Sequence, residues 1–123
     1  MPDPEHLPLL KVNGKLTLAE NNANNGGLRI AYLAPMNTLA AQKHPADEKI
    51  DGYTASQRFF LSFAQLWCQN QNLRSAWQSA AADPHSPARG RVNSAVQNFD
   101  EFGKAFGCTK GQPMYAANSC RVR

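Results

Sequence analysis

The sequence predicts an all-α fold for this chain of 123 residues, and three observations lead to that prediction. Two segments have the form of a capping box at a helix start, Thr17 with Glu20 and Thr54 with Gln57. Large apolar residues then recur at helical spacing after the second box, at Phe59, Phe63, Leu66 and Trp67. The sequence has no internal repeat, and it lacks the alternation of strand and helix patterns that would indicate a parallel sheet. The length leaves room for one domain at most.

The first half of the chain contains one long helical segment. Residues 1–16 are expected to form an irregular lead-in, because three prolines disfavour helix and Asn13-Gly14 is a turn signal. A helix is expected over residues 17–34, although the asparagines and glycines in its middle are poor helix formers. Pro35 should end or kink this helix near Ala34. Residues 36–50 are expected to hold a short helical remnant and a polar loop.

The second half is expected to contain three more helices. The most secure runs over residues 54–69, and a shorter one follows from Leu73 to Ala81 with Trp77 on its apolar side. Pro84 and Pro87 should fix the loop that contains His85. A last helix is expected to be capped by Asn98, with Glu101 at its third position and Gly107 as its C-terminal stop. The tail from Thr109 onward reads as irregular.

Charge and cysteine usage exclude several classes of protein. The net charge is +4 and the pI is near 9.2, but the Lys and Arg residues are scattered, so no nucleic-acid partner is predicted. No apolar run has the length of a membrane span, and the first residues have no signal-peptide pattern. The three cysteines, Cys68, Cys108 and Cys120, lack the C-x-x-C spacing of a metal site and by themselves fit three unrelated buried thiols.

Two side chains have a spacing that suits metal chemistry. Glu20 and Asn24 are four residues apart, so on a helix they lie on one face. That arrangement suits a metal ligand and a neighbour that orients another ligand. The capping box formed by Thr17 and Glu20 explains the same carboxylate without any metal, and spacing alone leaves both readings open. His85, between two prolines, by itself fits a residue of a surface loop.

Several residue strings in the sequence resemble those of a known family. The string from Val12 to Leu28 is similar to the block that carries the third zinc ligand of neprilysin-like and endothelin-converting-enzyme-like zinc metalloendopeptidases. Further similar strings follow in family order as far as the last residues: Asp51-Gly52-Tyr53-Thr54, Gln57-Arg58-Phe59-Phe60-Leu61, Phe63-Ala64-Gln65-Leu66-Trp67-Cys68, Asp83-Pro84-His85-Ser86-Pro87 and Cys120-Arg121-Val122. The resemblance implies that residues 17–123 are the C-terminal helical portion of a thermolysin-like (gluzincin) metallopeptidase catalytic domain, which is incomplete in this chain.

The resemblance also implies roles for individual residues. Glu20 matches the third zinc ligand, and Asn24 stands where the family has an aspartate that hydrogen-bonds a zinc-bound histidine. His85 matches the histidine that donates a hydrogen bond to the tetrahedral intermediate. Arg91 matches the arginine that grips a backbone carbonyl of a peptide substrate. Asp83, two residues before His85, is well placed to hold the imidazole in one tautomer.

The remainder of the zinc site is missing from the sequence. Its three histidines, His6, His44 and His85, do not form the His-Glu-x-x-His pattern that supplies two ligands and the base in the family. We therefore expect the chain by itself to bind no zinc and to be inactive, and its partner to be the missing N-terminal part of the catalytic domain. The alternative is a truncated non-catalytic paralogue that acts as a binding module or has no function.

The resemblance implies disulfides as well. Cysteines at these three places pair with partners nearer the N-terminus in animal members, so Cys68, Cys108 and Cys120 would lack their partners here. Disulfides form in oxidising compartments. An extracellular or cell-surface location is therefore expected for the parent protein.

Overall fold

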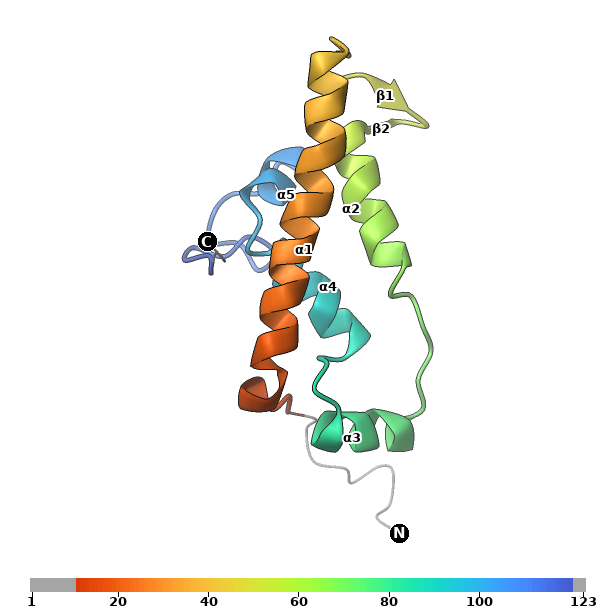
Figure 1. Cartoon of the computed structure of the whole chain (residues 1–123), viewed down its shortest axis with the longest axis vertical. Helices are drawn as coiled ribbons and strands as arrows, with labels where there is room; N and C mark the ends of the chain where they lie inside the picture. The colour runs from red at the N-terminus through yellow and green to blue at the C-terminus, as the bar shows by residue number, and fades with distance from the viewer. Residues whose placement is uncertain (1–10, 121–123) are drawn as a thin grey trace.

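The computed structural model describes residues 11–120, and helices make up most of them. The order of elements is α1 (Gly14–Ala41), β1 (Lys49–Ile50), β2 (Tyr53–Thr54), α2 (Ala55–Gln65), α3 (Leu73–Ala82), α4 (Ala88–Val96) and α5 (Asp100–Ala105). Helix α1 runs along the long axis of the molecule, with the β-hairpin and the start of α2 near one end and α3 near the other (Figure 1). The predicted helical class is confirmed, with one small antiparallel hairpin added.

Helix α1 begins three residues earlier than predicted, at Gly14. The side chain of Asn13 accepts hydrogen bonds of 3.2 Å from the backbone N–H groups of Lys15 and Leu16, and so caps the helix. Thr17 lies inside the helix and is buried, and its hydroxyl donates to the carbonyl of Asn13. The predicted capping box of Thr17 and Glu20 is therefore wrong, because Asn13 already satisfies the first free amides. The part of the predicted lead-in before residue 11, with its three prolines and His6, lies outside the described residues.

Pro35 does not end α1, which continues to Ala41. Proline removes one backbone donor, so the carbonyl of Ala31 loses its partner within the helix. Both residues are exposed, and water can satisfy that carbonyl. The buried side chains of Leu28 and Tyr32 hold the helix against the core just before this point. The remnant predicted after Pro35 is thus the last part of the same helix.

A tight hairpin then reverses the chain and starts α2. Strands β1 and β2 pair antiparallel, Lys49 with Thr54 and Ile50 with Tyr53. The two residues between them, Asp51 and Gly52, have φ of 53° and 84°, which the Asp-Gly sequence favours at a two-residue turn. This signal was in the sequence, but the prediction did not use it.

The capping box predicted at the start of α2 is confirmed. The N–H of Gln57 donates to Thr54 Oγ1 over 3.3 Å, and the N–H of Thr54 donates to Gln57 Oε1 over 2.9 Å. The amide of Gln57 also donates to the carbonyl of Ala105, 2.9 Å away, and so ties α2 to α5. The helix itself ends at Gln65, a few residues before the predicted end.

The core is an aromatic cluster that packs around Tyr32 in the second half of α1. The Tyr32 ring stacks on Phe60 with centroids 5.3 Å apart, and it meets Phe59 and Phe99 edge to face. Leu28, Ala95 and Val96 complete the buried part of the cluster. Because α1, α2 and α4 all contribute, this cluster fixes the mutual positions of the three helices that carry or adjoin the candidate site.

The part of the chain after α2 contains one confirmed helix, one that was missed and one that was displaced. Helix α3 matches its prediction and is capped by Asn72. Helix α4 was not predicted, although it directly follows Pro87 and buries Ala95 and Val96. Asn98 does not cap α5, because its side chain donates to the carbonyl of Ser94 and accepts from the N–H of Cys120. Phe99 occupies the cap position instead.

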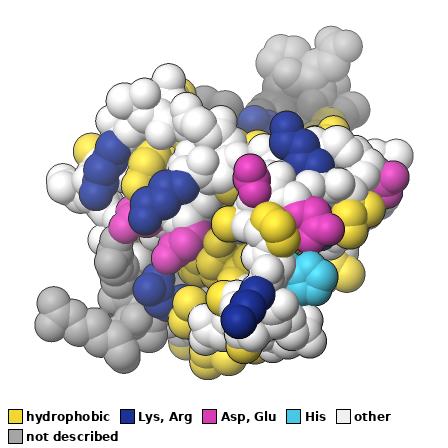
Figure 2. Space-filling model, turned by 90° about the horizontal axis from the view of Figure 1, so that it is seen from above, with side chains coloured by type: hydrophobic (Ala, Val, Ile, Leu, Met, Phe, Trp, Pro, Cys, Tyr) yellow, Lys and Arg dark blue, Asp and Glu magenta, His cyan; other side chains and the backbone are white. Residues whose placement is uncertain are grey.

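Charged side chains are dispersed over the surface. On the face in Figure 2, Lys and Arg side chains lie at separate places among acidic and apolar ones. This pattern agrees with the scattered basic residues of the sequence. Among residues 11–120, no helix has both the length and the apolar character needed to cross a membrane.

Candidate active site

Two parts of the chain that are distant in sequence bring a carboxylate and an imidazole together. Glu20 is on the first half of α1, and His85 is in the loop between α3 and α4. The distance from Glu20 Oε2 to His85 Nε2 is 3.2 Å. On the other side of the ring, His85 Nδ1 lies 2.8 Å from Asp83 Oδ1. Three of the predicted site residues therefore form one continuous chain of contacts, and all three side chains are partly exposed.

The Asp83 carboxylate is anchored twice by the same neighbour. The backbone N–H of His85 donates to Asp83 Oδ1 over 2.8 Å, and the ring Nδ1 approaches the same oxygen. These contacts, the backbone hydrogen bond first and the ring second, hold the pKa of the Asp83 carboxyl below its ordinary value of 3.8. The carboxylate is therefore ionised at neutral pH and accepts a hydrogen bond from the ring.

This geometry selects a tautomer for His85. An ionised carboxylate only accepts hydrogen bonds, so the Nδ1 that faces Asp83 carries hydrogen. Nε2 faces the second carboxylate, that of Glu20, and donates to it only when the ring carries hydrogen on both nitrogens. The expected orienting role of Asp83 agrees with these contacts.

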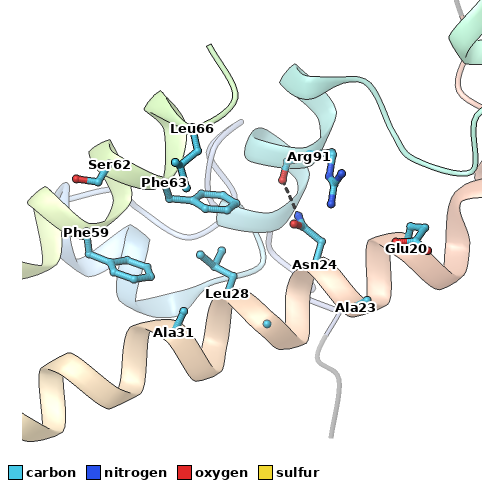
Figure 3. A pocket seen from close by; sticks show the side chains of 11 residues that line it. Glu20, Ala23, Asn24, Leu28, Ala31, Phe59, Ser62, Phe63, Leu66 and Arg91 are labelled. Atoms are coloured by element: carbon cyan, nitrogen blue, oxygen red, sulfur yellow. Dashed lines mark hydrogen bonds between the residues drawn. The ribbon is translucent and has the colours of Figure 1, made fainter. Parts of the chain in front are cut away.

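Arg91 lies on α4, and two contacts define its position. Its guanidinium carbon is 4.1 Å from the centroid of the Trp67 ring, a stacked cation–π arrangement. Its backbone carbonyl accepts a 2.9 Å hydrogen bond from the side-chain amide of Asn24 on α1 (Figure 3). The sequence analysis used Trp67 only for its helical spacing, and its contact with Arg91 was not foreseen.

Two of the hollows beside these residues are lined by predicted site residues. The larger of these two, of roughly 500 Å³, lies between α1, α2 and α4. Figure 3 shows Glu20, Asn24 and Arg91 toward one end of it, and Leu28, Phe59 and Phe63 toward the other. The smaller, of roughly 200 Å³, is lined by Trp67, Asp83, His85 and Arg91 among others. Polar groups thus lie beside an apolar groove, as in sites that bind an extended organic ligand.

The described residues do not by themselves form a zinc site. Within residues 11–120, no group of three or more His, Cys, Asp or Glu side chains is arranged to hold a metal ion. Glu20 faces a single histidine, whereas His44 lies on the turn after α1 and contacts Glu48 at 3.1 Å. One carboxylate beside one imidazole is fewer ligands than the three that a catalytic zinc requires.

The three cysteines are unpaired in the structure. Cys68 and Cys120 are exposed, and Cys108 is partly buried. The expected pairing with cysteines nearer the N-terminus stays a prediction.

The fold of this chain is similar to part of a solved zinc metalloprotease. The structure of the zinc metalloprotease Zmp1 from Mycobacterium tuberculosis in its open state matches 97% of this chain with a TM-score of 0.84 and 34% sequence identity. The inhibitor complex of the same protein matches 96% with a TM-score of 0.85. In both cases the match covers 18% of that protein.

The chain belongs to Peptidase family M13, whose family model matches residues 2–122. Endothelin-converting enzyme 1 from Bos taurus is 43% identical over 113 residues, which are 90% of this chain and 15% of that protein. Endothelin-converting enzyme-like 1 from Homo sapiens is 41% identical over 114 residues, or 91% and 14%. The chain thus spans about one seventh of the length of these relatives. The resemblance to neprilysin-like and endothelin-converting-enzyme-like proteins is confirmed.

Sequence reasoning missed a polar contact directly beside this site. Ser86 was noted only as part of a family string, and Asn21 only as a poor helix former. In the structure the hydroxyl of Ser86 donates to Asn21 Oδ1 over 2.8 Å. No pattern in the sequence pairs two residues 65 positions apart, so this contact was visible only after folding.

Proposed function

We propose that this chain forms the C-terminal part of the catalytic domain of a zinc metalloendopeptidase and completes its active site only together with a His-Glu-x-x-His helix from outside these 123 residues. The observation that carries the proposal is the contact of Glu20 with His85, which is itself held by Asp83. Residues that the family resemblance marks as functional converge at one place, although 65 residues separate Glu20 from His85.

In this proposal each residue has a defined task. Glu20 is one ligand of a zinc ion, which in the family activates water for attack on a peptide bond. Asp83 accepts a hydrogen bond from Nδ1 of His85 and keeps Nε2 turned toward the reacting carbonyl. With hydrogen on both nitrogens, Nε2 donates to the oxygen that gains negative charge in the transition state, a contact typically worth about 3 kcal/mol.

Arg91 is proposed to bind the substrate backbone. Its guanidinium offers several donors in one plane, which suits a peptide carbonyl. Stacking on Trp67 limits the orientations of that plane, and the hydrogen bond from Asn24 holds the backbone of Arg91 against α1. A peptide substrate and, following the resemblance, an extracellular or cell-surface location belong to this proposal.

One observation favours the second candidate, a non-catalytic paralogue that acts as a binding module. The side-chain amide of Asn24 donates to the carbonyl of Arg91, and an aspartate, which the family has at this position, is unable to donate when ionised. An amide also carries no charge to raise the basicity of a zinc-bound histidine. Asn24 therefore supports a structural contact here at the expense of the ligand-orienting one.

A chimera tests both candidates. This chain would replace the matching C-terminal region of Zmp1 from Mycobacterium tuberculosis, so that the remainder of that protein supplies the missing part of the site. We expect one bound zinc per chimera, measured by metal analysis, and cleavage of a fluorogenic peptide. Glu20→Gln should lose zinc, whereas His85→Ala should keep zinc and lower kcat by about 10²–10³-fold.

The matched control is Glu48→Gln, since Glu48 is also partly exposed and also contacts a histidine, at the other end of α1. It should change neither zinc content nor kcat. Full zinc content and activity in Glu20→Gln would overturn the proposal. A chimera that binds zinc but cleaves peptide only after Asn24→Asp would favour the non-catalytic paralogue.

A further inference from the structure

The loop that carries His85 is attached to α1 by a line of side-chain hydrogen bonds that no catalytic role requires. Ser86 Oγ donates to Asn21 Oδ1 over 2.8 Å. Asn21 Nδ2 donates to Thr17 Oγ1 over 3.1 Å, and Thr17 Oγ1 donates to the carbonyl of Asn13 over 3.2 Å. The line therefore begins at the cap residue of α1, follows one face of the helix at intervals of four residues, and ends on the loop.

The donors and acceptors in this line are used consistently. The hydroxyl hydrogen of Ser86, one amide hydrogen of Asn21 and the hydroxyl hydrogen of Thr17 each have one acceptor. Asn21 has to accept on one side and donate on the other, which a carboxamide does and a carboxylate or an apolar side chain does not. Thr17 is 2% exposed and Ser86 is 9% exposed, so the contacts at both ends are shielded from water. Shielded hydrogen bonds of this kind fix geometry, because breaking them leaves a buried polar group unsatisfied.

The line fixes the register of the loop relative to α1. Glu20 and Asn21 are neighbours on the helix, and His85 and Ser86 are neighbours on the loop. Glu20 contacts His85 at 3.2 Å, and Asn21 contacts Ser86 at 2.8 Å. Pro84 and Pro87 fix their own φ angles on either side, so few backbone dihedrals in the loop remain free. Holding Ser86 then leaves His85 little freedom to leave Glu20.

We infer that Asn21 and Ser86, supported by Thr17, are positioning residues that hold the His85 imidazole at the Glu20 carboxylate. They touch no proposed substrate and act through the loop and helix backbones. The inference rests on the proposed function only for the importance of His85. Its structural content is measurable in the 123-residue chain without zinc, peptide or activity.

The test is nuclear magnetic resonance of the full chain. The expected signature in the unmodified protein is a nuclear Overhauser cross-peak between the ring of His85 and the side-chain methylene protons of Glu20. Asn21→Ala and Ser86→Ala should each lose this cross-peak and shift the ring signals of His85. The double variant should shift them no further than either single variant, because both changes break the same contact.

Two kinds of control separate positioning from general damage. Asn22→Ala makes the same substitution on the adjacent, exposed residue of α1 and should keep the cross-peak. Ser86→Thr keeps the hydroxyl and should also keep it. The ring signals of Tyr32 and Phe60 in the core and of His44 at the far end of α1 should be unchanged in every variant.

Retention of the cross-peak in folded Asn21→Ala and Ser86→Ala would overturn the inference. Loss of the fold on removing the single hydroxyl of Ser86 would overturn it as well, since the contact would then be a requirement of the fold and not of the loop position. Neither result depends on the zinc content of the chimera, so failure of this inference and failure of the proposed function are distinguishable.

Discussion

The two halves of α1 are held to the rest of the molecule by different forces. From Gly14 to Gly27 the helix is rich in Asn and Gly, and its contacts are the hydrogen bond that Asn21 accepts from Ser86, the one that Asn24 donates to the carbonyl of Arg91, and the contact of Glu20 with His85. From Leu28 to Ala41 the contacts are mainly apolar, and the Tyr32 ring meets three other aromatic rings. One helix therefore combines a polar half that carries the candidate site with an aromatic half that carries the core.

The difference shows how a sequence with poor helix propensity is kept helical. Asn and Gly disfavour helix by up to about 1 kcal/mol each relative to alanine. Burial of one large apolar side chain contributes about 1.5–3 kcal/mol. The aromatic half thus stabilises the whole helix, and the polar half is free to use residues chosen for hydrogen bonding. The polar half should accordingly tolerate substitution with its fold intact, and the aromatic half should not.

The largest effect is expected from Phe60→Ala on α2, whose ring stacks on Tyr32 of the aromatic half. Phe60 is 2% exposed and contacts Tyr32, Phe59, Phe99 and Phe102. Its truncation should cost about 3–5 kcal/mol of unfolding free energy, a large part of the stability of a small domain. Urea denaturation followed by far-UV circular dichroism measures the change. Phe106→Ala, at a ring that is 37% exposed, is the matched control and should cost much less. Equal losses in the two variants would contradict the assignment of the core.

An intermediate effect, of opposite sign at two positions, is expected from Gly→Ala. A Cβ on Gly27 in the polar half meets no atom within 4 Å, so Gly27→Ala should raise the unfolding free energy by roughly 0.5–1 kcal/mol. A Cβ on Gly103 in α5 would overlap the Tyr115 ring, and Gly103→Ala should cost about 1–3 kcal/mol. The same denaturation experiment decides. Destabilisation by Gly27→Ala would mean that the polar half is more tightly packed around Gly27 than its contacts in the structure indicate.

The smallest effect is expected from pH. The pKa of Asp83 is lowered in the folded chain, so its ionised form stabilises the fold above the ordinary value of 3.8. That contribution is lost as the pH falls through the lower folded pKa. Below the folded pKa of Asp83, the melting temperature of the unmodified chain should therefore approach that of Asp83→Asn. Above pH 3.8 the difference between the two melting temperatures, here called the gap, should be constant. The carboxylate is exposed, so the gap itself should be small. A gap that does not change on acidification would show that the contacts with His85 are not made in solution.

Local signals in the sequence were sufficient for part of this fold. The capping box of Thr54 with Gln57 and the aromatic spacing after it located α2, because both depend on residues within a few positions of each other. The Asp-Gly turn at residues 51–52 was an equally local signal that the prediction did not use. Thr17 with Glu20 was read wrongly, because Asn13, four residues before Thr17, caps the helix and Thr17 lies inside it.

The sequence by itself determined the helical class, the family and the identity of the candidate site residues, since each of these depends on residue type and on order along the chain. The tertiary structure alone decided how those residues meet. It placed Glu20 3.2 Å from His85, turned Asn24 to the carbonyl of Arg91, and joined Ser86 to Asn21. Each of these contacts joins residues more than 60 positions apart, and their distance in space is set by the packing of the aromatic core and not by any local preference of the chain.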